Sequence, residues 1–66
     1  MTYEQYKGLI HAELRKRGRG MTWRELRDNL DLPYERACPE WTRRLEEDIG
    51  LIRRKGIGKA FLWSCG

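Results

Sequence analysis

The sequence predicts an α+β domain in which three helices are followed by a C-terminal β-hairpin. Apolar residues recur at helical spacing in three segments, and glycine or proline lies at the segment boundaries. The last segment consists of two short runs with strand character on either side of a glycine-rich turn. A chain of 66 residues holds one small hydrophobic core, so we assign residues 1–66 to a single domain.

The first helix is expected over residues 2–17, with Thr2 as its cap and Gly18 or Gly20 at its end. Residues at positions three and four apart lie on one face of a helix. The apolar stripe of this helix consists of Tyr6, Leu9, Ile10 and Leu14.

The second helix is predicted to begin at Thr22, because Thr22 and Glu25 fit a capping box. Met21 precedes this cap and is expected to pack on Leu26. The helix should end near residues 29–31. Pro33 disfavours helix in the residue before it, so residues 31–37 are expected to form a loop that holds one helical turn around residues 34–37.

The third helix is expected over residues 39–49, with a proline in its first turn and Gly50 as its stop. Its buried face is predicted to consist of Trp41, Leu45 and Ile49, extended backwards by Cys38 as a small core residue. Its exposed residues are predicted to be Glu40, Thr42, Arg43, Arg44 and Glu47. The hairpin follows, with strands at residues 51–54 and 60–64 and a turn at residues 55–59.

Two stretches resemble the winged-helix (winged helix-turn-helix) family of DNA-binding domains. Residues 45–54, Leu-Glu-Glu-Asp-Ile-Gly-Leu-Ile-Arg-Arg, are similar to the junction between recognition helix and wing, and residues 21–26 are similar to the opening of the second helix. The resemblance covers residues 21–63 and does not identify a subfamily. It implies that the third helix enters the major groove of duplex DNA and that the hairpin wing contacts the backbone or the minor groove.

Charge placement supports a polyanionic partner, because the net charge is +4 and ten of the 14 basic residues fall in two clusters. The first cluster, with Arg24 and Arg27 at its end, spans residues 15–27, and the second spans residues 53–59 of the predicted wing. We therefore predict DNA binding, with a role in transcriptional regulation as the family implies. The predicted DNA-contact residues are Thr42, Arg43, Arg44, Arg53, Arg54, Lys55 and Lys59.

A protein-interaction module is the alternative, with another protein or a second copy of the chain as partner. Acidic residues 46–48 near the end of the third helix repel a phosphate backbone, and Arg43 and Arg44 are spaced to pair with Glu47 and Asp48 instead. Ile57, at the tip of the wing, suits either a DNA groove or a protein contact.

An enzyme, a metal site and a cofactor are not expected. His11 is the only histidine and is interpreted as partly buried and structural, and Cys38 and Cys65 match no metal-ligand spacing. Trp23, Trp41 and Trp63 lie on apolar stripes and are expected in the core. The sequence shows no secretory signal and no apolar run of membrane-spanning length, so we expect a cytoplasmic protein that does not contact a membrane.

Overall fold

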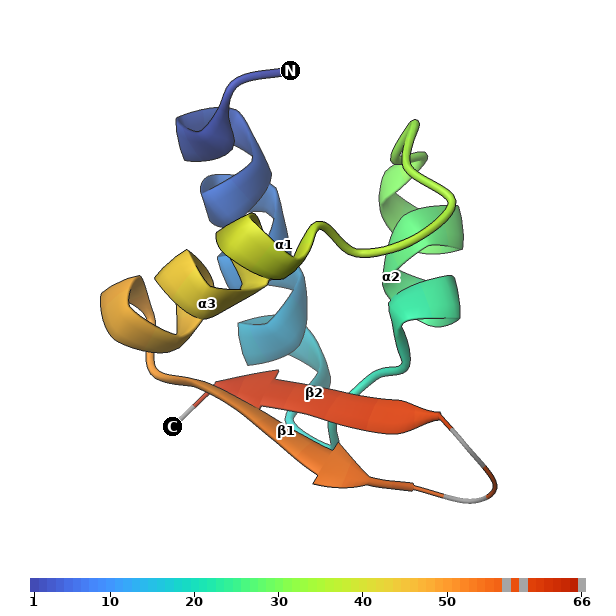
Figure 1. Ribbon diagram of the computed structural model, residues 1–66. Coiled ribbons are helices and arrows are strands. Elements are labelled where there is room, and N and C mark those ends of the chain that lie inside the picture. The colour runs from blue at the N-terminus through green and yellow to red at the C-terminus, as the bar shows by residue number, and fades with distance from the viewer. Residues whose placement is uncertain (57, 59, 66) are drawn as a thin grey trace.

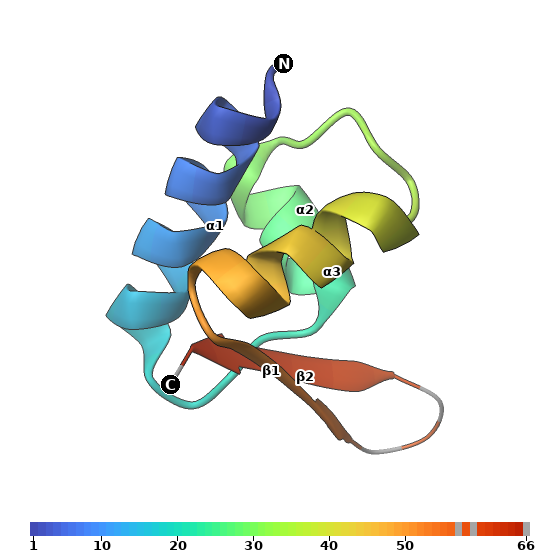
Figure 2. The same ribbon diagram turned by 60° about the vertical axis from the view of Figure 1, so that its left-hand side comes forward.

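Over residues 1–56, 58 and 60–65, which the computed structural model describes, the chain forms three helices followed by an antiparallel β-hairpin (Figure 1). The expected α+β class is therefore confirmed. The elements are α1 (Tyr3–Arg17), α2 (Trp23–Leu30), α3 (Pro39–Asp48), β1 (Leu51–Lys55) and β2 (Phe61–Cys65). The three helices lie on one side of the hairpin, so the hairpin closes one end of the helical layer (Figures 1 and 2).

Side-chain caps fix where α1 and α2 begin. The hydroxyl of Thr22 accepts from the Glu25 backbone N–H at 3.2 Å, and the Glu25 carboxylate accepts from the Thr22 N–H at 3.0 Å. Thr2 and Gln5 form the same reciprocal pair at the start of α1. Each pair satisfies backbone donors that the first turn leaves free. The predicted capping box at Thr22 is confirmed, as is the end of α1 at Gly18, which adopts a φ of 67°.

The connection between α2 and α3 contains no helical turn, so the expected turn around residues 34–37 is wrong. Side chains of α2 determine its path instead. The indole Nε1 of Trp23 and the guanidinium of Arg27 both donate to the backbone carbonyl of Glu35, at 3.1 and 3.3 Å. That carbonyl is thus satisfied from outside the segment, whereas a helical turn would use local backbone donors.

The hairpin is attached to the helical layer through Trp63. The backbone N–H and C=O of Trp63 both pair with Met21, at 2.6 and 2.8 Å, which adds a one-residue bridge to the edge of β2. The ring of Trp63 is 3% exposed and lies 5.4 Å from the ring of Trp23. The bridge was not predicted from the sequence, because one paired residue leaves no alternating strand pattern.

All five elements contribute to one core. Its buried apolar residues are Tyr3, Tyr6, Ile10, Leu14, Met21, Leu26, Leu32, Leu45, Leu51 and Trp63, with Trp23 and Trp41 packed against them. Two expectations about this core are wrong. Leu9 lies at the edge of the α1 stripe and is 39% exposed, and Cys38 is an exposed free thiol at the N-terminal cap of α3.

Gly20 and Gly8 give a matched pair of substitutions. Gly20 has a φ of 89°, and a Cβ there would meet the Trp63 carbonyl oxygen at 3.3 Å. Gly20→Ala is therefore expected to lower the free energy of unfolding by about 1–2 kcal/mol through backbone strain. Gly8 lies within α1, and a Cβ there meets nothing within 4 Å, so Gly8→Ala should raise the free energy by up to about 1 kcal/mol. Urea denaturation measures both, and equal effects would contradict the close approach at Gly20.

Candidate nucleic-acid interface

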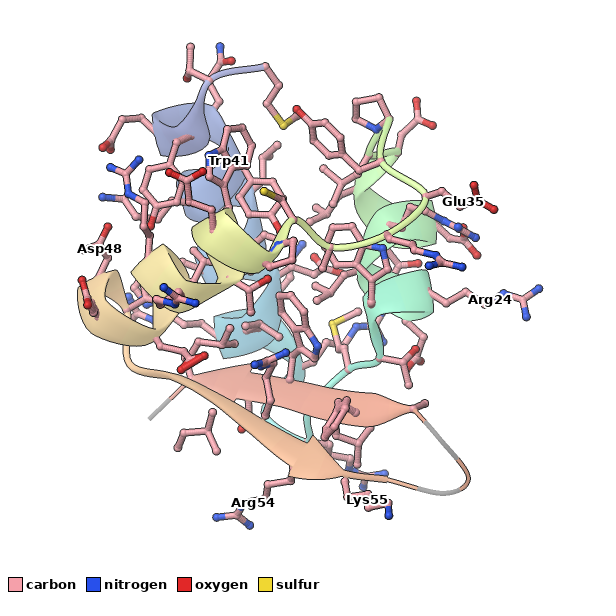
Figure 3. All side chains as sticks on the ribbon, viewed as in Figure 1. Arg24, Glu35, Trp41, Asp48, Arg54 and Lys55 are labelled. Atoms are coloured by element: carbon pink, nitrogen blue, oxygen red, sulfur yellow. The ribbon has the colours of Figure 1, made fainter. Side chains whose placement is uncertain are left out.

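The basic residues of β1 are exposed, as expected for a wing. Residues directly opposite one another in an antiparallel pair share a face of the sheet. Arg53 pairs with Trp63 and so faces the helices, whereas Arg54 pairs with Leu62 on the opposite face. The side chains of Arg54 and Lys55 extend from the hairpin into solvent (Figure 3). Lys59, which was predicted to contact DNA, and Ile57, which was predicted at the tip of the wing, lie outside the described residues.

Arg53 lies between a carboxylate and an aromatic ring. Its Nη2 is 3.4 Å from Glu46 Oε1, and its guanidinium carbon is 5.8 Å from the centre of the Phe61 ring. Both side chains of the ion pair are at least 40% exposed, and such pairs contribute at most about 1 kcal/mol. These contacts hold Arg53 over the inner face of the hairpin, and a phosphate can still compete for its donors.

An open groove of about 810 Å³ separates the hairpin from the start of α2 and from the α2–α3 connection. It is lined by Thr22, Trp23, Arg24, Arg36, Ala37, Arg53, Ala60, Phe61 and Trp63. Three arginines from three different segments therefore meet at one hollow, and no carboxylate is among the described lining residues. Phe61, which is 49% exposed, gives the groove an apolar wall beside its cations.

Arg24 and Arg36 are exposed, and neither belongs to an ion pair among the described residues. Arg24 extends from the first turn of α2 into solvent (Figure 3). Arg24 was expected only as a member of the first basic cluster, and no role was predicted for Arg36. Arg36 is an isolated cation in an irregular segment, so the sequence pattern offered no signal for it. Only the path of the connection brings it to the groove.

The first basic cluster is divided by the fold. Arg24 reaches the groove, whereas Arg27 contacts Asp28 and the carbonyl of Glu35. Residues 15–17 form the last turn of α1, which lies near the base of the hairpin and away from its tip (Figure 2). Cations at the C-terminal end of a helix are favoured by the helix dipole, so this turn is explained without a ligand.

Thr42 does not lie on the exposed face of α3, and this expectation is wrong. The residue is 3% exposed, and its hydroxyl donates to the Cys38 carbonyl oxygen at 2.8 Å. A threonine that bonds the carbonyl four residues earlier needs no other partner, so it can be buried at little cost. Its position beside Leu45 places it in the core, away from the exposed surface of α3.

Arg44 and Asp48 are turned towards α1. The guanidinium carbon of Arg44 lies 4.0 Å from the centre of the Tyr3 ring, and the Tyr3 hydroxyl donates to Asp48 Oδ2 at 2.8 Å. Burial, together with the hydrogen bond to Asp48, raises the pKa of Tyr3 to about 12. Asp48 also lies 3.9 Å from Lys7 Nζ, and it marks the C-terminal end of α3 in Figure 3. These contacts join α3 to α1 and occupy Arg44.

The outer face of α3 carries more acid than base. Glu40, Arg43 and Glu47 are exposed there, and Glu46 faces the wing through Arg53. The expected pairs Arg43–Glu47 and Arg44–Asp48 are not among the ion pairs of the described residues. Of the three α3 residues predicted to contact DNA, Arg43 alone has an outward position without a described partner. This face repels a phosphate backbone more than it attracts one.

The fold defines the class of the chain: a three-helix domain with a C-terminal hairpin, a topology consistent with a winged helix. The comparisons go no further, because no protein-family model matches the chain and neither the curated proteins nor the solved structures contain a significant match. Within the described part of the chain, no helix is long and apolar enough to span a membrane.

Proposed function

We propose that this chain binds duplex DNA through the hairpin and the adjoining groove, with the outer face of α3 held clear of the phosphates. The observation that carries this proposal is the meeting of Arg24, Arg36 and Arg53 at a groove whose described lining contains no carboxylate. Arg54 and Lys55 extend the basic surface along β1. A net charge of +4 favours association of the whole chain with a polyanion.

In this proposal the guanidinium groups of the three arginines donate hydrogen bonds to phosphate oxygens. Each presents a planar set of donors that matches two phosphate oxygens, so arginines from three segments can follow a backbone through the groove. The exposed Phe61 ring packs against the apolar side of the deoxyribose. Phosphate contacts fix the position of a protein on DNA and carry no sequence information. The proposed binding is therefore tolerant of sequence, and a transcriptional role would depend on contacts elsewhere.

Arg36→Ala and Arg43→Ala distinguish the groove from helix α3. Both residues are exposed and lack a described ion-pair partner, so each variant removes one exposed cation. Arg36→Ala is expected to weaken binding to a random-sequence duplex about fivefold at low salt, the equivalent of about 1 kcal/mol for one charged contact. Arg43→Ala should change it less than twofold.

Fluorescence anisotropy with a labelled duplex measures both affinities. A larger loss for Arg43→Ala would assign DNA binding to α3 and overturn the groove. No loss for Arg36→Ala would contradict the groove. No saturable binding by the unmodified chain would leave the protein-interaction module as the better description.

A further inference from the structure

A second hollow, of about 330 Å³, lies at the other end of the molecule from the hairpin. It opens between the start of α1, the α2–α3 connection and the start of α3, and is lined by Met1, Tyr6, Tyr34, Cys38 and Trp41. In Figure 3 Trp41 lies beside the first turns of α1, far from Arg54 and Lys55. None of the groove arginines contributes to this pocket, so it is independent of the proposed DNA surface.

Three aromatic rings form the wall of this pocket. The Tyr6 and Trp41 rings lie 4.9 Å apart, and Tyr34 meets Trp41 edge-on at 5.9 Å with an interplanar angle of 82°. Tyr6 and Tyr34 are also in edge contact, at 6.1 Å. Because each ring packs against the other two, the three form a fixed apolar wall with few polar groups. Such a lining, in a volume near the lower end for ligand pockets, suits a small aromatic molecule.

The Tyr6 hydroxyl is a buried polar group of this wall that has no partner among the described residues. Tyr6 is 1% exposed, and its hydroxyl makes no hydrogen bond to any described residue. A buried hydroxyl without a partner is costly, and a ligand atom that accepts from it removes that cost. Burial raises the pKa of Tyr6 above its ordinary value, so the hydroxyl keeps its proton and acts as a donor.

We propose that this pocket binds a small, neutral aromatic compound whose carbonyl oxygen accepts a hydrogen bond from Tyr6. The ring of the compound stacks against Trp41 and Tyr34. A charged compound is disfavoured, because the described lining residues include no charged side chain to compensate for its lost hydration. Met1 is 51% exposed, and its unbranched side chain moves aside to admit the ligand.

Acetophenone and ethylbenzene test the two parts of the proposal. They share a ring and a two-carbon substituent, and only acetophenone has a carbonyl oxygen. Each is titrated into ¹⁵N-labelled protein, and the indole N–H signals of the three tryptophans are followed. We expect the Trp41 signal to shift with both compounds, the Trp63 signal to stay in place, and acetophenone to bind about tenfold more tightly.

Tyr6→Phe keeps the ring and removes the hydroxyl, so the preference for acetophenone should disappear in this variant. Tyr3→Phe is the matched control, because Tyr3 is not among the described lining residues and its hydroxyl donates to Asp48, so its removal should leave the preference intact. Absence of any Trp41 shift in the unmodified chain overturns the site. A preference that survives Tyr6→Phe, or that is lost in Tyr3→Phe, overturns the assigned donor.

Discussion

Replacing Arg24, Arg36 and Arg53 together by glutamine is expected to weaken duplex DNA binding about a hundredfold at low salt. The reason is the loss of three charged contacts at about 1 kcal/mol each, where 1.4 kcal/mol corresponds to a factor of ten. The three side chains are exposed and belong to separate segments around the groove, so glutamine leaves the core intact. Affinity is measured by fluorescence anisotropy, and circular dichroism checks that the variant is folded.

A control with the same loss of charge is available in the last turn of α1. Arg15, Lys16 and Arg17 are exposed, and their replacement by glutamine lowers the net charge by the same three units. If binding depended on total charge alone, the two variants would lose affinity equally. We expect the α1 variant to lose less than about tenfold, because its cations act on the DNA only through the long-range field. Equal losses would contradict a localised groove.

Trp63→Ala is expected to have the largest effect on stability. Its ring is 3% exposed and packs on Trp23, so truncation leaves a cavity under the hairpin. The expected loss is about 3–5 kcal/mol in the free energy of unfolding. Chains of this size unfold with a total of about 3–10 kcal/mol, so the variant should be substantially unfolded at room temperature. Urea denaturation followed by circular dichroism measures the change.

Leu62→Ala provides the comparison for Trp63→Ala. Leu62 immediately precedes Trp63 in β2 but points to the opposite face of the hairpin, where it is 36% exposed. Its truncation should cost less than about 1 kcal/mol. A large effect at Leu62 and a small one at Trp63 would mean that the hairpin packs on the helices through its other face.

The helices and the hairpin were predictable because their signals are local. Thr22 and Glu25 identify a capping box at a spacing of three. Pro39 and Gly50 bracket α3, which ends at Asp48, one residue before the predicted end. Both strands end one residue later than predicted, at Lys55 and Cys65, and β2 also begins one residue later, at Phe61. Such features depend on a few neighbouring residues, and the rest of the fold reinforces them.

The candidate nucleic-acid interface was harder to predict. It depends on how α3 is rotated about its own axis and on the path of the α2–α3 connection. The polar side chain of Thr42 suggested an exposed position. The residue is buried in the core instead, because its hydroxyl donates a hydrogen bond to the Cys38 carbonyl oxygen. The same rotation turns Arg44 onto Tyr3. Arg36 reaches the groove because Glu35 is held by Trp23 and Arg27, a contact between segments that periodicity does not encode.

The salt dependence of DNA binding tests the central claim most directly. Each phosphate contact contributes about 0.9 to the slope of log affinity against log salt concentration. The slope for the Arg24, Arg36 and Arg53 variant should therefore be shallower than that of the unmodified chain by about 2.7, whereas the α1 variant should keep nearly the full slope. An unchanged slope in the groove variant would contradict the assignment of these arginines to phosphate binding.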